Sequence, residues 1–286
     1  MNIKELLKKT EQFFKQHNIP QPRLDAEVLL ADLLDMERIK LYVNFDYPLQ
    51  DNQLAAFRER VIRRAKREPV PYITEKKEFM SLDFKIKEGV LVPRPETELL
   101  VEEIITYCEE QSLDQPNIVE IGTGSGVIMI SLGHYINQAK ILGIDTSQKA
   151  VELTRKNIKK HELEDRLRVS RGDLLEPLIK REQENVDIVV SNPPYVSQDD
   201  MGTLPPEVKK EPDIALAGGE DGLEMYRKLI PQAKKVLLPG GLLALEIGYD
   251  QGEDIKDILK ENGWEDVKII KDYNNNDRIV FSHNIS

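Results

Sequence analysis

The residues of this chain best suited to chemistry form a short turn after the largely apolar run 187–191. The turn consists of Asn192, Pro193, Pro194 and Tyr195. The Asn192 side-chain carbonyl and the Pro193 backbone carbonyl can both accept hydrogen bonds from an NH2 group. Proline fixes its own φ, so these acceptors are held in place before a substrate arrives. The Tyr195 ring can lie flat against a planar group. The turn therefore suits the binding of a planar, weakly nucleophilic nitrogen, although a rigid turn after a strand is the simpler alternative.

A second candidate feature is a glycine-rich turn between an apolar run and an expected helix over 127–132. The turn consists of Gly122, Thr123, Gly124, Ser125 and Gly126. Its glycines let the backbone approach a ligand closely, near the N–H groups of the helix. A dinucleotide-binding fingerprint would need glycine at position 127, which is Val127. The observed spacing is more usual for S-adenosylmethionine. Together the two turns indicate methyl transfer onto an amide or an exocyclic amine.

Two acidic residues follow later strand runs. Asp145 ends the run 141–144, about twenty residues after the glycine turn, where an acidic residue can accept from both ribose hydroxyls. Its alternative role is the N-cap of a helix that begins near Ser147. Asp173, beside Leu174, ends a third run, where a contact with an adenine edge is expected; a loop cap is the alternative.

Neither a metal site nor a general base is evident. The single cysteine, Cys108, excludes an internal disulfide framework. The four histidines lie outside the motifs: His17, His134, His161 and His283. Since neither Asn nor Tyr titrates appreciably near neutral pH, we expect turnover to be nearly flat from about pH 6.5 to 9.

The pattern from residue 90 onward predicts an α/β domain. Apolar runs over 117–121, 141–144, 167–170, 188–191 and 242–247 alternate with helical stretches such as 150–160. This order is typical of a mostly parallel sheet with helices on both faces. The last two runs, 267–270 and 278–281, flank an Asn-rich turn and predict a pair of strands, so the end of the sheet is antiparallel.

The first 75 residues predict a small all-helical domain. Apolar residues recur at three- and four-residue steps over 3–14, 24–34 and 54–62, with Asp51 as a plausible N-cap of the third helix. Alternation at Leu82, Phe84 and Ile86 predicts a short hairpin. We therefore expect a helical bundle over 1–75 that docks the substrate, a hairpin linker over 76–92 and a catalytic domain over 93–286.

Composition narrows the partners. The chain has 286 residues, 40% of them hydrophobic, and a net charge of −11, which argues against broad attraction to nucleic acid. One basic cluster is either a solvated helix face or a docking patch for an acidic partner or RNA: Arg58, Arg60, Arg63, Arg64, Lys66 and Arg67. No apolar run approaches 18 residues and the N-terminus lacks a signal-peptide core, so we expect a cytoplasmic monomer with no membrane association.

The chain resembles the peptide-chain release factor glutamine methyltransferases, a family of class I methyltransferases, and several specific segments carry the resemblance. These segments are VPRPETE at 92–98, VEIGTGSG at 119–126, SNPPY at 191–195, EP at 211–212, AGGEDG at 217–222, LEIG at 245–248, DY at 272–273, and Arg278. The resemblance implies a Rossmann-like fold with a helical N-terminal domain. It also implies S-adenosyl-L-methionine as cofactor, S-adenosyl-L-homocysteine as product, and methylation of N5 of the glutamine in the Gly-Gly-Gln motif of class 1 release factors.

By position, the resemblance also assigns roles. Residues 122–126 would line the methionine part of the cofactor, Asp145 would hold the ribose, and the turn 192–195 would bind the glutamine, with Asn192 also touching the cofactor. Leu174 stands where some relatives place Trp beside adenine, so aliphatic packing would replace stacking there. Ordering of a lid over the pocket is one interpretation of Arg94 and Glu96.

Two rival functions use the same features. An adenine-N6 DNA methyltransferase also needs to grip a planar NH2 group, but it must flip its base and would normally carry a basic recognition domain. The acidic chain fits a protein substrate better, and we expect no direct DNA binding. A non-catalytic binding protein with a vestigial methyltransferase fold is the other rival, and the intact polar turns argue against it.

Overall fold

The computed structural model describes residues 1–182 and 185–285. The chain divides into two compact units. Unit 1 comprises Met1–Lys76 together with Pro205–Lys210, and unit 2 comprises Lys77–Leu204 together with Glu211–Ser286. Each unit has its own hydrophobic core. No helix among the described residues is long and apolar enough to cross a membrane.

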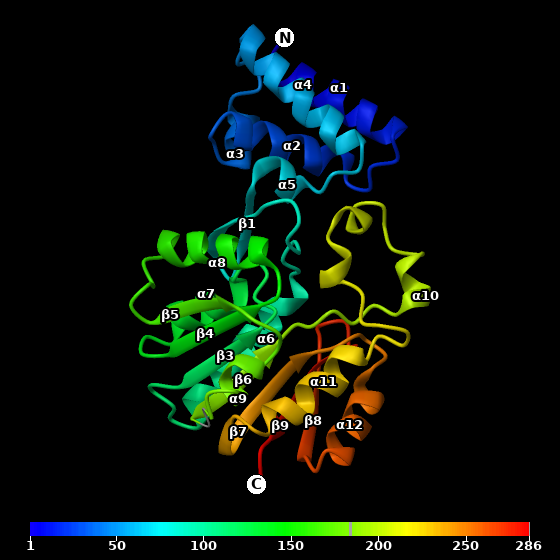
Figure 1. The fold of residues 1–286 in the computed structure, drawn as a ribbon. Helices are drawn as coiled ribbons and strands as arrows, with labels where there is room; N and C mark the ends of the chain where they lie inside the picture. The colour runs from blue at the N-terminus through cyan, green and yellow to red at the C-terminus, as the bar shows by residue number, and fades with distance from the viewer. Residues whose placement is uncertain (183–184, 286) are drawn as a thin grey trace. The chain divides into compact units, whose positions relative to one another are not determined.

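Unit 1 is helical (Figure 1). Its helices are α1 (Ile3–Gln16), α2 (Pro22–Leu33), α3 (Arg38–Val43), α4 (Asp51–Ala65) and α5 (Val70–Thr74). The three longest coincide with the three predicted periodic stretches, apart from Leu34, which is the C-cap of α2, because their apolar residues are buried together. Helix α3 escapes such a prediction since it is short and buries a single residue, Leu41.

Two helix starts in unit 1 show how side chains satisfy the first backbone N–H groups. In α1, Asn2 accepts from the Glu5 N–H at 2.9 Å, which forms half of a capping box. For α4, the prediction of Asp51 as N-cap is wrong by one residue. The N-cap is Gln50, whose N–H donates to the Gln53 side chain at 2.9 Å, and Asp51 is the first helical residue.

Most residues of the basic cluster on and after α4 form ion pairs inside unit 1. Arg60 meets Asp32 at 2.6 Å. Arg64, whose side chain is only 6% exposed, lies 2.7 Å from Asp25 and 3.0 Å from Glu207. Two further pairs join Arg63 to Glu68 and Arg67 to Glu207. These arginines therefore stabilise the helical unit itself.

Unit 2 is built on a seven-stranded sheet in the order β5-β4-β3-β6-β7-β9-β8. The strands are β3 (Asn117–Ile121), β4 (Lys140–Asp145), β5 (Leu167–Arg171), β6 (Val186–Ser191), β7 (Leu237–Glu246), β8 (Glu265–Lys271) and β9 (Asp277–His283). Neighbours from β5 to β7 pair in parallel, and β9 runs antiparallel to β7 and β8. The predicted fold class, mostly parallel with an antiparallel end, is confirmed.

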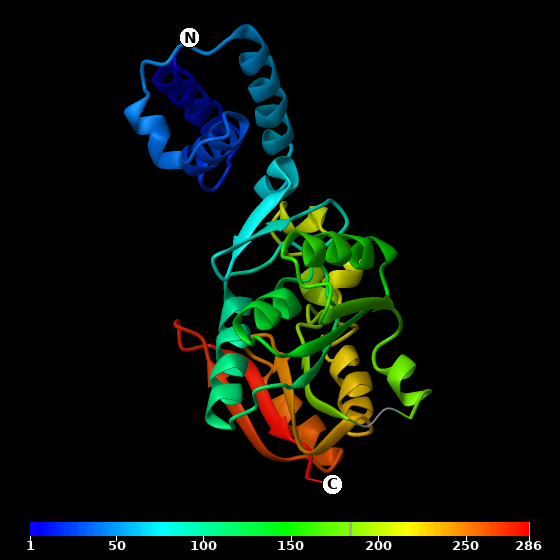
Figure 2. The same ribbon diagram turned by 90° about the vertical axis from the view of Figure 1, so that its left-hand side faces the viewer.

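Helices cover both faces of this sheet (Figures 1 and 2). These helices are α6 (Glu96–Glu110), α7 (Val127–Tyr135), α8 (Gln148–Lys160), α9 (Glu176–Ile179), α11 (Glu224–Ala233) and α12 (Gly252–Glu261). The loop after β6 carries the short helix α10 (Gln198–Met201) and a 3-10 turn at Asp213–Ala215, and the 3-10 turn Val208–Lys210 belongs to unit 1. Alternation along β3 separates the faces. Val119 and Ile121 join the core formed with α11 and α12, whereas Glu120 accepts from the Met129 N–H of α7 at 3.0 Å.

A two-stranded sheet, β1 (Lys76–Phe79) and β2 (Leu82–Lys85), precedes the large one. Met80 and Ser81 between them have φ of 49° and 58°. Two successive positive φ values are typical of the tight turn that joins hairpin strands. The predicted hairpin is therefore present, with its first strand beginning at the end of unit 1.

Strand register brings four strand ends to one edge of the large sheet. Ile121 of β3 pairs with Ile144 of β4 on one side and with Ser191 of β6 on the other, and Ser191 also pairs with Leu245 of β7. The chain order changes direction between β3 and β6. In open α/β sheets, ligands bind beyond the carboxyl ends of the strands at such a switch point.

We expect Gly126→Ala to destabilise the chain more than Gly240→Ala. Both glycines have positive φ, 83° and 81°, so both substitutions strain the backbone. A Cβ at position 126 would lie 2.8 Å from Thr154 Cγ2, whereas one at position 240 meets nothing within 4 Å. Overpacking of this kind costs about 1–3 kcal/mol, and that difference in the free energy of unfolding should appear in denaturant titrations. Equal losses would contradict the close packing of the turn.

Candidate active site

A cavity of about 310 Å³ lies in unit 2 at the carboxyl edge of the sheet. Its volume is at the lower end of the range typical of small-molecule sites. The predicted residues that line it are Gly122, Thr123, Gly124, Ser125, Asp145, Asp173, Leu174, Asn192 and Pro194. Among the described residues, the predicted members outside this lining are Gly126, Pro193 and Tyr195. Strand ends thus bring together most of the residues that the sequence singled out.

The glycine turn and Asn192 are neighbours because β3 and β6 pair. Gly122 and Asn192 directly follow the paired residues Ile121 and Ser191. The Ser191 hydroxyl donates to the Ile121 carbonyl at 2.8 Å, which ties the two strand ends together. A Cβ at Gly122 would lie 3.9 Å from the Asn192 carbonyl oxygen. Gly126 is the N-cap of α7, and its N–H closes the turn by donating to the Thr123 carbonyl at 2.7 Å.

The Asp145 carboxylate is held by two backbone donors. One oxygen accepts from the Gly124 N–H at 2.9 Å and the other from the Ser147 N–H at 2.8 Å. Burial raises the pKa of Asp145, and these two N–H groups oppose the rise. The N-cap of α8 is Ser147, whose hydroxyl accepts from the Ala150 N–H. The alternative role of Asp145 as the N-cap of this helix is therefore wrong. Each Asp145 oxygen keeps a lone pair for a hydroxyl group in the cavity.

The loop after β5 gives the cavity an apolar wall. The Gly172 N–H donates to the Asp145 carbonyl at 3.0 Å, which extends the pairing of β4 and β5 by one residue. Leu174 follows with φ of 44° and is 5% exposed, packed into the main core while also lining the cavity. Asp173 lies beside it in the lining. A flat, partly apolar group would find an aliphatic surface here.

The turn 192–195 is supported from behind by the segment 217–222. Val196 and Ala217 form a β-bridge, and a Cβ at Gly218 would lie 2.8 Å from the Pro194 carbonyl oxygen. A Cβ at Gly222 would collide with the Tyr195 carbonyl. Gly218 and Gly222 are therefore required by the close approach of their backbone to the turn.

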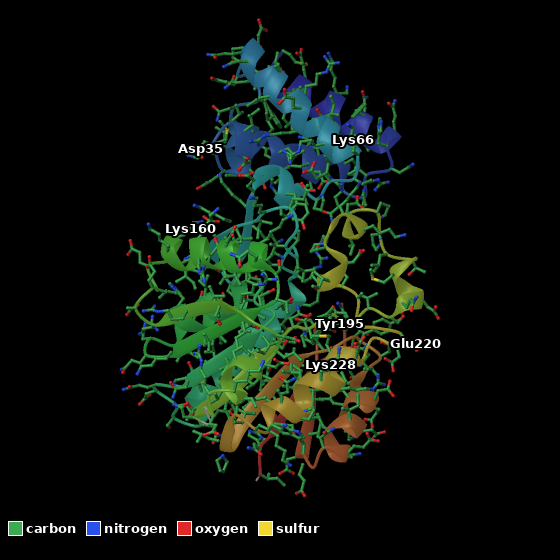
Figure 3. All side chains as sticks on the ribbon, viewed as in Figure 1. Asp35, Lys66, Lys160, Tyr195, Glu220 and Lys228 are labelled. Carbon is green, nitrogen blue, oxygen red and sulfur yellow. The ribbon has the colours of Figure 1, made fainter. Side chains whose placement is uncertain are left out.

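Tyr195 (Figure 3) is partly buried against the main core. Its carbonyl accepts from the Gln251 side-chain amide at 3.1 Å. Burial, and after it the charge of Glu246, raise the pKa of the Tyr195 phenol to about 12. The ring is therefore neutral at physiological pH and suited to van der Waals contact, and its contact with a substrate stays a prediction.

Two polar side chains near Asn192, those of Thr97 and Glu246, were not predicted from the sequence. The Asn192 Nδ2 donates to the Thr97 hydroxyl at 3.1 Å, and the same hydroxyl lies near the buried carboxyl group of Glu246. Burial raises the pKa of Glu246 to about 7. A titratable group thus lies beside the turn, within the pH range for which we expected a flat profile. The feature of the sequence that could have revealed this group is Glu246 itself, an acidic residue inside the apolar run 242–247.

Arg94 ties down one wall of the cavity. Its guanidinium lies 2.7 Å from Glu211, whose other oxygen accepts from the Val92 N–H at 2.9 Å. Glu211 is 5% exposed, and the cavity-lining segment 212–217 directly follows it. Glu96, which the sequence grouped with Arg94, is exposed at the start of α6. Within the described residues no cluster of three or more His, Cys, Asp or Glu could hold a metal ion.

Two regions of the chain match known protein families. A family model described as "PrmC N-terminal domain" matches residues 5–74, and one described as "Methyltransferase small domain" matches residues 95–204. A release factor glutamine methyltransferase of Clostridium acetobutylicum is 41% identical over 99% of this chain and 98% of the relative. Proteins of the same name from Clostridium botulinum and Geobacter sulfurreducens are 39% and 38% identical, over 98% and 97% of this chain and 98% and 95% of each relative.

Solved structures of low identity share the fold. The hMettl16 catalytic domain in complex with a MAT2A 3'UTR hairpin superposes with a TM-score of 0.58 at 17% identity, covering 83% of each chain. The T. thermophilus 16S rRNA N2 G1207 methyltransferase in complex with AdoMet and guanosine gives 0.53 at 17% identity, covering 73% of this chain and 49% of its own. These likenesses support the class I methyltransferase fold.

We expect Arg94→Met to loosen the segment 211–217, because Glu211 would lose its only ion pair among the described residues. Hydrogen–deuterium exchange should show faster exchange of the backbone amides in 211–217, with little change in the strands. The matched control is Arg227→Met, which removes a pair between side chains that are about half exposed and should change little. Unchanged exchange in the Arg94 variant would show that other contacts hold the segment.

Proposed function

This chain belongs to the release factor glutamine methyltransferase family, and from that premise we propose its reaction. The chain transfers a methyl group from S-adenosyl-L-methionine to N5 of the glutamine in the Gly-Gly-Gln motif of class 1 peptide-chain release factors. The observation that carries the proposal is one cavity lined by the glycine turn, Asp145 and Asn192, in a chain 41% identical to a named relative over nearly its full length.

The residues around the cavity fit the cofactor. Gly122 and Gly124 have φ of 74° and 56°, which lets the backbone approach a ligand where a side chain would intervene. We assign the turn 122–125 to the methionine part, Asp145 to the ribose hydroxyls, and Asp173 with Leu174 to the adenine. When bound, S-adenosylmethionine supplies an electrophilic methyl group on a sulfonium sulfur, and S-adenosylhomocysteine is the product.

The turn 192–195 prepares the nucleophile. A side-chain amide nitrogen reacts poorly because its lone pair is delocalised into the carbonyl. Asn192 Oδ1 and the Pro193 carbonyl would accept from its two hydrogens, which raises the electron density on nitrogen and favours a pyramidal geometry. These contacts strengthen as the new bond forms, which is the condition for raising turnover. Tyr195 would support the plane of the amide.

We propose that the helical bundle of residues 1–75 docks the release factor, and that the enzyme acts as a cytoplasmic monomer. The structure bears on the DNA rival through the basic cluster. Arg60, Arg63, Arg64 and Arg67 are paired with carboxylates of the same unit. Paired guanidinium groups have little to offer phosphates, and the chain carries a net charge of −11. A protein substrate is favoured.

The test of this function is mass spectrometry of a class 1 release factor incubated with the enzyme and S-adenosylmethionine. We expect one added methyl group on the peptide that contains Gly-Gly-Gln, and none when that glutamine is replaced by alanine. Duplex DNA serves as the competing acceptor with methyl-labelled cofactor. Label in DNA and none in the release factor would overturn the proposal in favour of the DNA rival.

Asn192→Ala should lower kcat by about 10²–10³-fold, by analogy with loss of one oriented group that stabilises a transition state. Cofactor affinity, measured by calorimetry, should change little because other residues line most of the cavity. Asn274→Ala, an exposed turn residue, is the control and should behave as wild type. Full activity in the Asn192 variant would remove this residue from the reaction.

Asp145→Ala should raise the cofactor Kd by about 10–100-fold, because a charge-assisted hydrogen bond contributes about 1.5–3 kcal/mol. The kcat at saturating cofactor should fall less. Calorimetry with S-adenosylhomocysteine measures the affinity directly. Asp165→Ala, whose side chain is 71% exposed, is the control. An unchanged Kd would show that another group holds the ribose.

A further inference from the structure

Thr97 and Glu246 lie where they can control the orientation of Asn192. Glu246 follows Leu245 on β7, and Asn192 follows Ser191 on β6; Leu245 and Ser191 are register partners. The two side chains therefore extend from neighbouring strand ends. Thr97 belongs to the first turn of α6, is 3% exposed, and accepts from Asn192 Nδ2 at 3.1 Å. Its hydroxyl also lies near enough to the Glu246 carboxyl group to oppose the rise in the pKa of that group.

From this arrangement we propose that Thr97 and Glu246 are positioning residues, which fix the Asn192 amide with its NH2 group on Thr97 and its carbonyl oxygen turned to the cavity. The inference rests on the proposed function, since it explains how Asn192 presents an acceptor to the substrate amide. Neither residue is assigned a contact with the reacting atoms. Their effect passes through the orientation of one side chain.

Hydrogen-bond chemistry sets the direction. A carboxylate can only accept, and a hydroxyl has a single hydrogen to donate. When ionised Glu246 accepts the Thr97 hydrogen, Thr97 can only accept from Asn192. Asn192 must then direct Nδ2 toward Thr97, as observed at 3.1 Å, and Oδ1 is left for the substrate. The amide orientation thus follows from the donor and acceptor count.

The charged and titratable groups around Glu246 come from four elements. Arg278 on β9, Arg94 just before α6, Glu96 at its first residue, and the phenols of Tyr195 and Tyr226 all interact with it electrostatically. Glu246 Oε2 and Arg278 Nε have no hydrogen-bond partner in the described part of the chain. Thr97 is the side chain whose hydroxyl is placed to donate to this carboxyl group.

Protonation of Glu246 would release this constraint. A protonated carboxyl group can donate to Thr97, whose own hydrogen is then free to donate to Asn192 Oδ1. The Asn192 amide could turn over and present NH2 to the substrate, which is the wrong polarity. Because the pKa of Glu246 is raised to about 7, the productive orientation is present above this pH and is lost as pH falls through it. The wild-type kcat should therefore decline below about pH 7.

Side-chain NMR tests the orientation without turnover. The Asn192 NH2 signals are identified by their loss in Asn192→Ala. In the wild-type protein they should shift with a single titration midpoint near that of Glu246, and Glu246→Gln should abolish this titration. The control Glu265→Gln changes an exposed carboxylate and should leave it intact. A titration that persists in Glu246→Gln would overturn the proposal even if the enzyme is active.

Kinetics with a release factor completes the test. Thr97→Val should lower kcat by about 10–100-fold, since misplacement of a group by about 1 Å can cost 10²-fold, with KM and the cofactor Kd within twofold of wild type. Thr97→Ser should restore kcat, because it keeps the hydroxyl. Thr106→Val makes the same change at an exposed position of α6 and should have no effect.

Glu246→Gln should lower kcat about tenfold at pH 8, because a carboxamide offers Thr97 either a donor or an acceptor, and its profile should lack the decline below pH 7. A wild-type kcat in Thr97→Val would overturn the inference. If the wild-type enzyme itself transfers no methyl group, the proposed function fails, and the NMR titration still decides whether Glu246 orients Asn192.

Discussion

The pairing of four parallel strands determines where the polar groups of the site lie. Ile144, Ile121, Ser191 and Leu245 stand in one row across β4, β3, β6 and β7. Each is followed within one residue by a group of the site, so a carboxylate, a glycine, an amide and a second carboxylate meet at one edge. A slip of one residue in any pairing would turn its polar group to the opposite face of the sheet. The buried apolar residues of these strands prevent such a slip, and core packing thereby fixes the geometry of the chemistry.

The strands of the sheet and the position of the cavity were predictable because their signals are local in the sequence. Apolar runs predicted the strands, and residues directly after them, such as Asp145 and Asn192, predicted the edge at which the cavity lies. Contacts between distant segments were not predictable. Thr97 meets Asn192, and Arg94 meets Glu211, yet neither pair has a periodic signal, because the partners lie on a helix and in loops whose docking depends on tertiary packing. The six-residue helix α3 escaped for the related reason that it is too short to show a period.

Charge in this chain is balanced locally despite the acidic total. The arginines of α4 meet carboxylates of their own unit, and Arg94 meets a carboxylate that is 5% exposed. Such pairs are costly to break, since removing one partner leaves a desolvated charge. A cluster that reads as a patch for phosphates in the sequence is thus structural in the folded chain. Glu246 differs because no guanidinium lies within ion-pair distance of it among the described residues, and its ionisation therefore remains adjustable near neutral pH.

The membership of Pro205–Lys210 in unit 1 has a consequence for biosynthesis. The five helices of this unit are translated before residue 207, but Arg64, with a side chain only 6% exposed, pairs with Glu207 as well as Asp25. Until residue 207 has been translated, the guanidinium has one of its two carboxylates. Completion of the amino-terminal unit therefore waits for the strand β6 and the turn 192–195 to emerge, which couples the maturation of that unit to synthesis of the catalytic segment.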